Sequence, residues 1–474
     1  MNRTALRILA IAALAPILAF AQTPAPPSTT GKVPPTTWVD KDTGHRVWRI
    51  SNEPNSGAFY FNVNGYTPDL KTMIYTAPDG IHTLDLATRK TKLLVPNPPR
   101  PANPDPAARF GGVHAIIAGS KTNSVFYSQA DPTTHVVTLY KADVYSGKIT
   151  RLCDLPQGMG VATINADETL GAGTMNDKPD AINYGDRRVT PPGLAVEAPH
   201  VQPANKGQMM EERLAARTPL TLFTINLTTG KLTPLLHSTD WVNHLLFSPS
   251  DPTLLMYCHE GPWQKVDRIW MIHTDGTHNT LIHKRSIAME IAGHEFWGLD
   301  GKTIWYDWQP IKGQDFYLAG YDLATGKRTA FHMDRNDWSI HFNLTKDLDI
   351  FCGDGGDVGQ VAKAPDGEWI ELFHPRMIPT TGALNDPDFF QPGVFHSERL
   401  VNMAQHNYKL EPNVRFSPDK SLVIFTSNMF GPSYIFAVET AKTDNFNPKE
   451  IFSTPALAAQ FNPGKPPDTS NVIK

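Results

Sequence analysis

Histidines gather in one part of this chain. Eleven of its 17 histidines lie between residues 244 and 406. His259, His294 and His341 each lie where a strand pattern begins or ends, in the segments CHEGP, GHEFW and WSIHFN. Neutral imidazoles that converge can hold a divalent metal ion, and a single imidazole can act as a general base near neutral pH. For any one of these histidines, a hydrogen bond between neighbouring strands is the alternative interpretation.

The elements that would position these histidines recur along the chain. A turn with Pro-Asp or Asp-Gly precedes an alternating strand, and a second strand ends in Thr-Gly-Lys, as at 229–231 and 325–327. The strands are rich in Ile, Val, Tyr, Phe and Trp. The spacing of roughly 45 to 60 residues is typical of four-stranded propeller blades. We therefore predict an all-β fold, a seven-bladed β-propeller; eight blades or an array of β-sandwiches are the alternatives.

The two ends of the chain and one internal segment depart from this rhythm. Arg3 and Arg7, an apolar run and Ala19-Phe20-Ala21 predict a signal peptide over 1–21 and a periplasmic or secreted protein. We expect a Pro-rich linker at 22–35, the propeller at 36–460 and a tail at 461–474. The segment 175–219 is expected to be a long inserted loop with a short helix near 208–216, either a lid or a plain insertion.

Composition excludes several classes of function. The 43 basic and 47 acidic side chains nearly balance, so nucleic acid is not an expected partner. Three cysteines are too few for a disulfide framework. No later segment is long and apolar enough to span a membrane, so we expect no membrane insertion after signal cleavage. The oligomeric state is left open.

The run from Tyr257 to Gly301 closely resembles the oligogalacturonate lyases, family 22 of the polysaccharide lyases. It carries Cys-His-Glu-Gly-Pro, then a strand containing Asp and Arg, then His-Glu-Phe-Trp after about 35 residues. The specific motifs lie within 257–419, and the first half of the chain fits only as generic propeller. The resemblance implies a seven-bladed propeller that cleaves short pectic oligosaccharides by β-elimination with a bound manganese ion.

The resemblance also implies roles for individual residues. His294 matches the Brønsted base of the family, Arg268 its catalytic arginine and His341 one of its metal-binding histidines. His259 belongs to a motif near the site and is a candidate for binding substrate. Arg187 and Arg188 on the inserted loop are further candidates for binding an acidic substrate, with a solvated charge pair as the alternative.

The last metal segment of the family is altered here. The family has Gln, two residues and then His-Pro-His, whereas this chain has Tyr408 to Asn413, with Glu411 and Asn413 in place of the two histidines. His406, just upstream, is a candidate replacement ligand. The expected metal set is therefore His341, His406, Glu411 and Asn413. Mn²⁺ is the first expectation, and Ca²⁺ or Mg²⁺ also suits such oxygen donors.

The chemistry implied by the resemblance suits these residues. An arginine can bind a uronate carboxylate with two hydrogen bonds, and a neutral histidine can remove the adjacent C5 proton. Tryptophans near the motif, such as Trp263, either stack on sugars or belong to the core. The predicted function is thus a metal-dependent lyase for short uronate oligosaccharides in pectin breakdown. The alternatives are a lyase for another uronate-containing oligosaccharide and a non-enzymatic periplasmic binding propeller.

Overall fold

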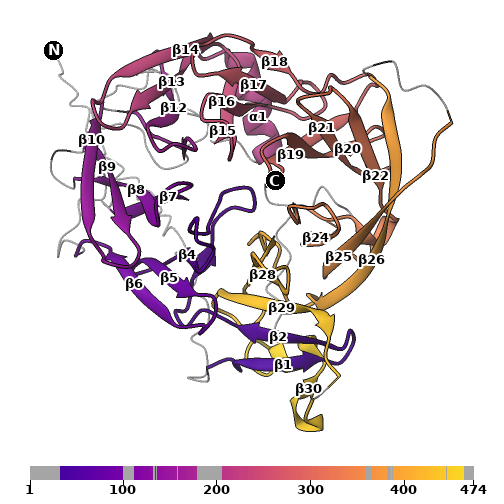
Figure 1. Ribbon diagram of the computed structural model, residues 1–474. Coiled ribbons are helices and arrows are strands. Elements are labelled where there is room, and N and C mark those ends of the chain that lie inside the picture. The colour runs from indigo at the N-terminus through magenta and orange to yellow at the C-terminus, as the bar shows by residue number, and fades with distance from the viewer. Residues whose placement is uncertain are drawn as a thin grey trace, which may run out of the picture.

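The chain forms a closed ring of mainly antiparallel sheets (Figure 1). The computed structural model describes residues 33–99, 112–131, 134, 136–156, 158–178, 205–358, 364–381, 386, 388–444 and 446–463. Neighbours in each four-stranded sheet follow chain order, and hydrogen-bonded strands run antiparallel. This confirms the predicted all-β propeller class.

Four of the sheets have four strands each. The first contains β3 (Gly57–Ala58), β4 (Thr72–Ala77), β5 (Gly80–Asp85) and β6 (Thr91–Pro96). The second contains β7 (Val113–Ala118), β8 (Ser124–Ala130), β9 (Val137–Asp143) and β10 (Ile149–Leu155). The third contains β11 (Thr163–Ile164), β12 (Leu170–Asn176), β13 (Leu220–Asn226) and β14 (Leu232–Ser238). The fourth contains β15 (Trp241–Phe247), β16 (Leu254–Glu260), β17 (Ile269–His273) and β18 (Thr280–Leu281).

The next sheet has eight strands. Its first half contains β19 (Ile291–Trp297), β20 (Thr303–Gln309), β21 (Tyr317–Asp322) and β22 (Arg328–His332). Its second half contains β23 (Phe342–Leu344), β24 (Phe351–Gly353), β25 (Trp369–Met377) and β26 (Phe390–Asn402). The halves join where β22 pairs in parallel with β26. The expected count of seven blades depends on dividing the sheet at this pairing, and it stays a prediction.

The last sheet joins both ends of the described chain. It contains β27 (Arg415–Phe416), β28 (Leu422–Ser427), β29 (Tyr434–Lys442), β30 (Ile451–Phe452), β1 (Thr37–Asp40) and β2 (His45–Arg49). Strand β2 pairs antiparallel with β29, so the N-terminal strands close the ring against C-terminal ones. Trp38 donates a hydrogen bond to the hydroxyl of Thr454 at 2.7 Å, which reinforces this closure.

Strand burial follows the stacking of the sheets. In β4 the four residues from Thr72 to Tyr75 are all buried, because a central strand has a neighbouring sheet on each face. The outer strand β6 is partly exposed. Figure 1 shows β7, β15 and β19 on the inner side of the ring, with β6, β10 and β14 at its rim.

The turns between strands match the sequence pattern. Gly230 and Gly326 both have a φ of +69°, a conformation that glycine adopts without strain, and each follows the threonine of a Thr-Gly-Lys turn.

Helices are short and few among the described residues. They are α1 (Lys206–Ala216), η1 (Arg335–Asp337), η2 (Pro448–Glu450) and α2 (Thr454–Ala458). Helix α1 lies in the segment expected to be an inserted loop, and the side chain of Asn205 caps it by accepting from the Gln208 amide at 2.8 Å. The expected short helix is therefore present, and it begins two residues earlier than predicted.

Candidate active site

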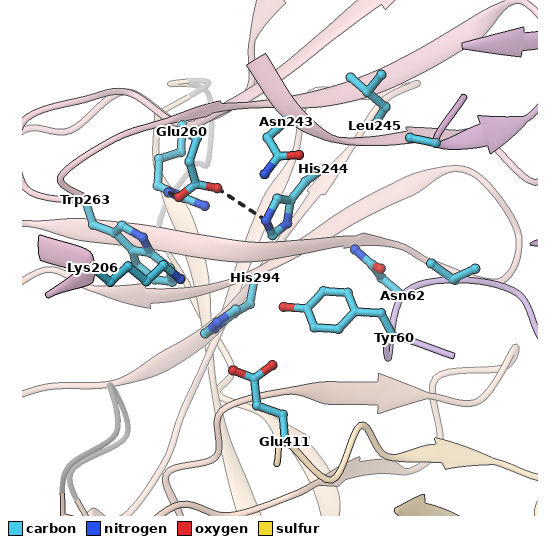
Figure 2. A pocket seen from close by; sticks show the side chains of 13 residues that line it. Tyr60, Asn62, Lys206, Asn243, His244, Leu245, Glu260, Trp263, His294 and Glu411 are labelled. Atoms are coloured by element: carbon cyan, nitrogen blue, oxygen red, sulfur yellow. Dashed lines mark hydrogen bonds and ion pairs between the residues drawn. The ribbon is translucent and has the colours of Figure 1, made fainter. Parts of the chain in front are cut away.

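A cavity of about 390 Å³ opens where the inner strands of several blades meet. Figure 2 shows the side chains that line it, which include aromatic, acidic, basic and amide groups. Its lining residues are Tyr60, Asn62, Val63, Ala162, Lys206, Asn243, His244, Leu245, Glu260, Trp263, Arg268, His294 and Glu411. A second cavity of about 580 Å³ has no histidine in its lining, so none of the candidate histidines lies there.

His294 reaches the cavity from an irregular point in the innermost strand β19. The pairing of β19 with β20 shifts register between Gly293 and Phe296, and His294 has a φ of +46°. Such a bulge re-aims one side chain out of the regular alternation. Nδ1 of His294 lies 3.4 Å from Oδ2 of Asp307, and its ring meets Trp263 edge-on at 4.9 Å. Burial lowers the pKa of His294, and the charge of Asp307 offsets only part of this effect. The imidazole is thus held neutral, the form that a base needs.

Arg268 forms a buried ion pair with Glu260. Nη1 of Arg268 donates to Oε1 of Glu260 at 2.8 Å, and both side chains are almost fully enclosed. The guanidinium also lies 4.3 Å from the ring centre of Trp263, a cation–π contact. Burial disfavours the charged forms of both side chains, but their attraction to nearby opposite charges outweighs burial. The pKa of Glu260 therefore lies well below its ordinary value, and the pKa of Arg268 lies above its ordinary value. The cavity therefore contains a fixed cation.

His244 lies between two carboxylates. Its Nε2 is 3.3 Å from Glu260 and its Nδ1 is 3.7 Å from Glu295. Burial lowers the pKa of His244, but the hydrogen bond to Glu260 and the charges of Glu295 and Glu260 outweigh burial and raise it above its ordinary value. Figure 2 shows His244 facing the same space as His294 and Tyr60.

His341 is buried beneath the cavity and fixed from two sides. Its Nδ1 lies 2.8 Å from Oδ2 of Asp354, and its Nε2 lies 3.1 Å from Oη of Tyr60. Its ring stacks on Phe61 and is 4.9 Å from the ring of His294. A carboxylate on the far nitrogen is the usual support of a metal-binding histidine.

The segment 408–413, which differs from the family pattern, places one side chain beside His341. Oε2 of Glu411 lies 3.7 Å from Nε2 of His341 and lines the cavity. The side chain of Asn413 is instead hydrogen-bonded to the backbone. Its Nδ2 donates to the carbonyl of Glu411, and its Oδ1 accepts from the N–H of Phe61.

His406 lies outside this cluster, contrary to the sequence-based expectation. Its Nδ1 is 2.9 Å from the Ser427 hydroxyl and its Nε2 is 2.7 Å from the Leu410 carbonyl. Both ring nitrogens are therefore engaged in fastening the segment that carries Glu411, and neither is directed to a shared metal. His406 therefore has the structural, hydrogen-bonding role that was the alternative interpretation for each histidine.

Of the residues expected to bind substrate, His259 is described by the structure and is not part of the cavity lining. His259 lies on β16 next to Glu260, but its Nε2 faces Asp240 at 3.3 Å, because successive side chains of a strand point to opposite faces. Arg187 and Arg188 lie outside the described residues. Stacking on sugars and burial in the core were the alternatives for the tryptophans near the motif: Trp263 lines the cavity, whereas Trp338 is buried in the core.

Sequence reasoning missed several cavity residues. Tyr60 and Asn62 come from the first blade, which carries no specific motif, and Lys206 begins helix α1. His244 could have been found by aligning the inner strands, since WVNHLLF and IAGHEFW both carry histidine at their fourth position.

The fit of a divalent cation depends on the donors near His341. Across the part of the chain that the structure describes, no three His, Cys, Asp or Glu side chains are placed to hold a metal together. His341, which is buried, and Glu411, which lines the cavity, nevertheless form a pair with one nitrogen and one carboxylate donor. Cations such as Mn²⁺ and Mg²⁺ often combine a few protein ligands with water and substrate oxygens. The pair fits such a cation as a partial site.

Comparisons of the sequence with known proteins agree with one another. The profile of the family described as oligogalacturonate lyase matches residues 193–443. An oligogalacturonide lyase of Pectobacterium atrosepticum is 25% identical over 257 residues, which span 52% of this chain and 61% of that protein. An oligogalacturonate lyase of Dickeya dadantii is 24% identical over 336 residues, 67% of this chain and 77% of that protein.

Solved structures extend the likeness to most of the fold. An oligogalacturonate lyase in complex with manganese superposes with a TM-score of 0.65 at 20% identity, covering 86% of this chain and 97% of that one. An oligogalacturonate lyase from Vibrio parahaemolyticus gives a TM-score of 0.62 at 19% identity, covering 86% of this chain and 96% of that one. At these identities the likeness is evidence for the fold. Among the described residues, no helix has the length and apolar character to cross a bilayer.

Proposed function

The chain belongs to the oligogalacturonate lyase family, and on this premise we propose that it cleaves short galacturonate oligosaccharides by β-elimination. The observation that carries the proposal is the convergence of His294 and Arg268 on one cavity, from two neighbouring blades. A binding propeller has no need of a neutral histidine beside a buried arginine. This pair is what the removal of a proton next to a carboxylate requires.

The two residues divide the work of the first step. The C5 proton of a uronate is weakly acidic, because the adjacent carboxylate is already negative. Arg268 stabilises the further negative charge that develops on that carboxylate, inside a cavity where such an interaction is strong. His294 receives the proton at Nε2, since its Nδ1 faces Asp307. Asp307 then stabilises the imidazolium that forms.

A divalent cation, with Mn²⁺ the first candidate, is part of the proposal. His341 and Glu411 would hold it at the cavity wall, with Asp354 fixing the ring of His341. When bound, the cation supplies Lewis-acid stabilisation of the uronate carboxylate. Support comes from the related lyase solved in complex with manganese.

Other cavity residues suit an acidic sugar. Trp263 offers an apolar ring beside the base, and its π-face is already directed to Arg268. Lys206 adds a second cation at the first turn of α1, where the helix dipole also favours anions. The described end of the inserted segment thus contributes to substrate binding.

Further expectations form part of the same proposal. Residues 1–21 would direct the chain to the periplasm or the medium, where pectic fragments are generated, and the product would enter pectin breakdown. The boundaries at 22–35, 36–460 and 461–474 stay predictions.

The segment 408–413, with Glu411 and Asn413 in place of two histidines of the family, supports a second candidate function. This is a lyase of the same mechanism for another uronate-containing oligosaccharide.

The test is an assay of the unsaturated product by its ultraviolet absorbance. The purified protein receives di- and trigalacturonate with Mn²⁺, and in parallel with EDTA. We expect activity that EDTA abolishes and that His294→Asn lowers by about 10² to 10⁴-fold, the contribution of a general base. Activity only on other uronate oligosaccharides would support the second candidate. No activity on any of them, with metal bound, would favour a binding propeller.

The control variant is His278→Asn. His278 has a φ of +54°, close to that of His294, but lies exposed outside the cavity. Asparagine tolerates this left-handed conformation better than most residues, so both variants should keep the fold.

A further inference from the structure

Two histidines enter the cavity in the same way from neighbouring blades. His244 is the fourth residue of β15 and His294 the fourth of β19. Both have a left-handed backbone, with φ values of +49° and +46°. In both strands the pairing with the next strand shifts register at the histidine. The shift lies between Asn243 and Leu246 in β15 and between Gly293 and Phe296 in β19. The bulge that re-aims the base therefore has a counterpart with no assigned role.

The surroundings of the two imidazoles differ. His294 has a single carboxylate near one nitrogen, whereas His244 has Glu260 on one side of its ring and Glu295 on the other. A neutral imidazole has one N–H, and only the imidazolium can present an N–H to two acceptors. The side chain of Glu295 is fully buried, and beside the weak thiol donor of Cys258 its charged neighbour is His244. This geometry favours a protonated His244.

We propose that His244 is the general acid that protonates the leaving oxygen while His294 removes the C5 proton. The inference rests on the proposed function. Nε2 is the donating atom, because it faces Glu260, which lines the cavity, whereas Nδ1 faces Glu295, which does not. Glu260 also holds Arg268, so it remains paired when His244 turns to the substrate.

The step balances without any co-reactant. The C5–H bond breaks and its proton goes to Nε2 of His294, and the electron pair forms the C4=C5 double bond. The C4–O4 bond breaks, its electrons stay on O4, and O4 takes the proton from Nε2 of His244. The products are an unsaturated uronate and a sugar with a free hydroxyl. Water then returns a proton to His244 and removes one from His294.

Tyr60 is the rival donor in the same cavity. Burial and the nearby charges of Glu411 and Glu295 raise the pKa of Tyr60 well above its ordinary value, so its hydroxyl keeps its proton. That hydroxyl lies 3.1 Å from Nε2 of His341, a ring already fixed by Asp354. The two carboxylates beside His244 favour its protonated form, so water can restore the proton on His244 after each turnover.

The experiment compares two leaving groups. Oligogalacturonate releases a sugar hydroxyl, which needs a proton, whereas a galacturonate carrying a nitrophenyl ether at O4 releases a stable nitrophenolate. For His244→Asn we expect kcat to fall by about 10² to 10⁴-fold with the sugar leaving group. With the nitrophenyl ether we expect a loss of less than about tenfold. His294→Asn should lose activity on both substrates, because both need the base.

Three results would overturn the inference. An equal loss on both substrates would mean that His244 only supports the fold or Arg268. A selective loss in Tyr60→Phe, without one in His244→Asn, would assign the acid to Tyr60. If the unmodified protein cleaved neither substrate, the proposed function itself would fail, and the inference with it. His278→Asn serves again as the control, and circular dichroism checks that each variant is folded.

Discussion

At the scale of single residues, each of three imidazoles near the cavity has a neighbouring carboxylate, but the imidazoles differ in their surroundings. Each has a carboxylate on or just after the second strand of its own blade: His244 has Glu260, His294 has Asp307 and His341 has Asp354. The hydrogen bond to Glu260 and the charges of Glu295 and Glu260 together raise the pKa of His244 against the effect of burial, while burial dominates at His294 and lowers its pKa. Environments that push the pKa values of two groups apart are how one site obtains an acid and a base.

The raised pKa of His244 predicts how activity depends on pH. Its acid form is required, so kcat on oligogalacturonate should fall as the pH rises through a pKa that lies above the ordinary 6.5. The groups that face it are Glu260 and Glu295, which raise this pKa, Arg268, which lowers it, and the neutral Tyr60. The measurement is kcat against pH with a sugar leaving group.

The same profile with the nitrophenyl ether is the control for this prediction. It should lack the alkaline decline, because nitrophenolate leaves without a proton. In His244→Asn the decline should vanish from the oligogalacturonate profile as well. An alkaline decline that survives in the variant would assign the titration to another group.

Glu411 is predicted to bind the cation together with His341. Glu411→Gln keeps the shape of the side chain but removes its charge, so we expect Mn²⁺ affinity in the presence of galacturonate to fall by about 10 to 100-fold. The free Mn²⁺ in a titration can be followed by electron paramagnetic resonance, independently of turnover. Glu211→Gln, on the exposed face of α1, is the control. Unchanged Mn²⁺ binding would place the cation elsewhere.

At the scale of the elements, bulges in the inner strands β15 and β19 direct His244 and His294 into the cavity. The bulge interrupts the regular alternation at His294, which lines the cavity, while the next residue, Glu295, reaches His244 of the preceding blade. The sequence predicted the recurring strands well, since the Thr-Gly-Lys turns at 229–231 and 325–327 lie between β13 and β14 and between β21 and β22. It did not reveal the bulges, because a left-handed histidine has no compositional signal. His244 was therefore missed, although it matches His294 in position.

Gly293 tests the importance of the bulge. A Cβ at this residue would lie 2.6 and 2.7 Å from ring atoms of Trp263, so the ring would have to move. We expect Gly293→Ala to lower kcat/KM, because Trp263 contacts both His294 and Arg268, and to destabilise the fold by about 1–3 kcal/mol from overpacking. The measurements are steady-state kinetics and urea unfolding.

Gly320→Ala separates the two effects. Its Cβ would lie 2.9 Å from the ring of Trp305, a similar clash on β21 away from the cavity. This control should lose comparable stability and keep kcat/KM per folded molecule. Equal kinetic losses in both variants would mean that the effect of Gly293→Ala comes through global stability.

At the scale of the whole molecule, the cavity combines residues from both ends of the ring. Tyr60 and Glu411 both face it, and Arg415 donates to the carbonyls of Val63 and Tyr60 at 3.1 and 3.0 Å, so a C-terminal strand holds an N-terminal segment. Repeats in the sequence predict that such blades stack, but not which loop ends meet. For this reason the sequence did not show that His406, four residues after the end of β26, bonds Ser427 and Leu410 and not a shared metal.

Closure of the ring should therefore control both stability and activity. Trp38, Thr454 and Asp40 form a fully buried chain of hydrogen bonds, with 2.7 Å from Trp38 to Thr454 and 2.7 Å from Thr454 to Asp40. Thr454→Val leaves the indole N–H and the carboxylate without this partner, which costs about 1–3 kcal/mol for each buried group. Trp38→Phe removes the donor, so the two changes together should cost less than their sum, by about 0.5–3 kcal/mol.

Urea unfolding followed by circular dichroism measures this coupling, and lyase activity in the same urea series reports on the cavity. We expect the single variants to lose activity and secondary structure at the same, lowered urea concentration, because the cavity exists only while both ends of the ring are joined. Additive free energies would show that Trp38 and Thr454 act separately. Activity that persists beyond the unfolding of the closing sheet would mean that the residues from the middle of the chain, among them His244, Arg268 and His294, suffice for catalysis without the ring.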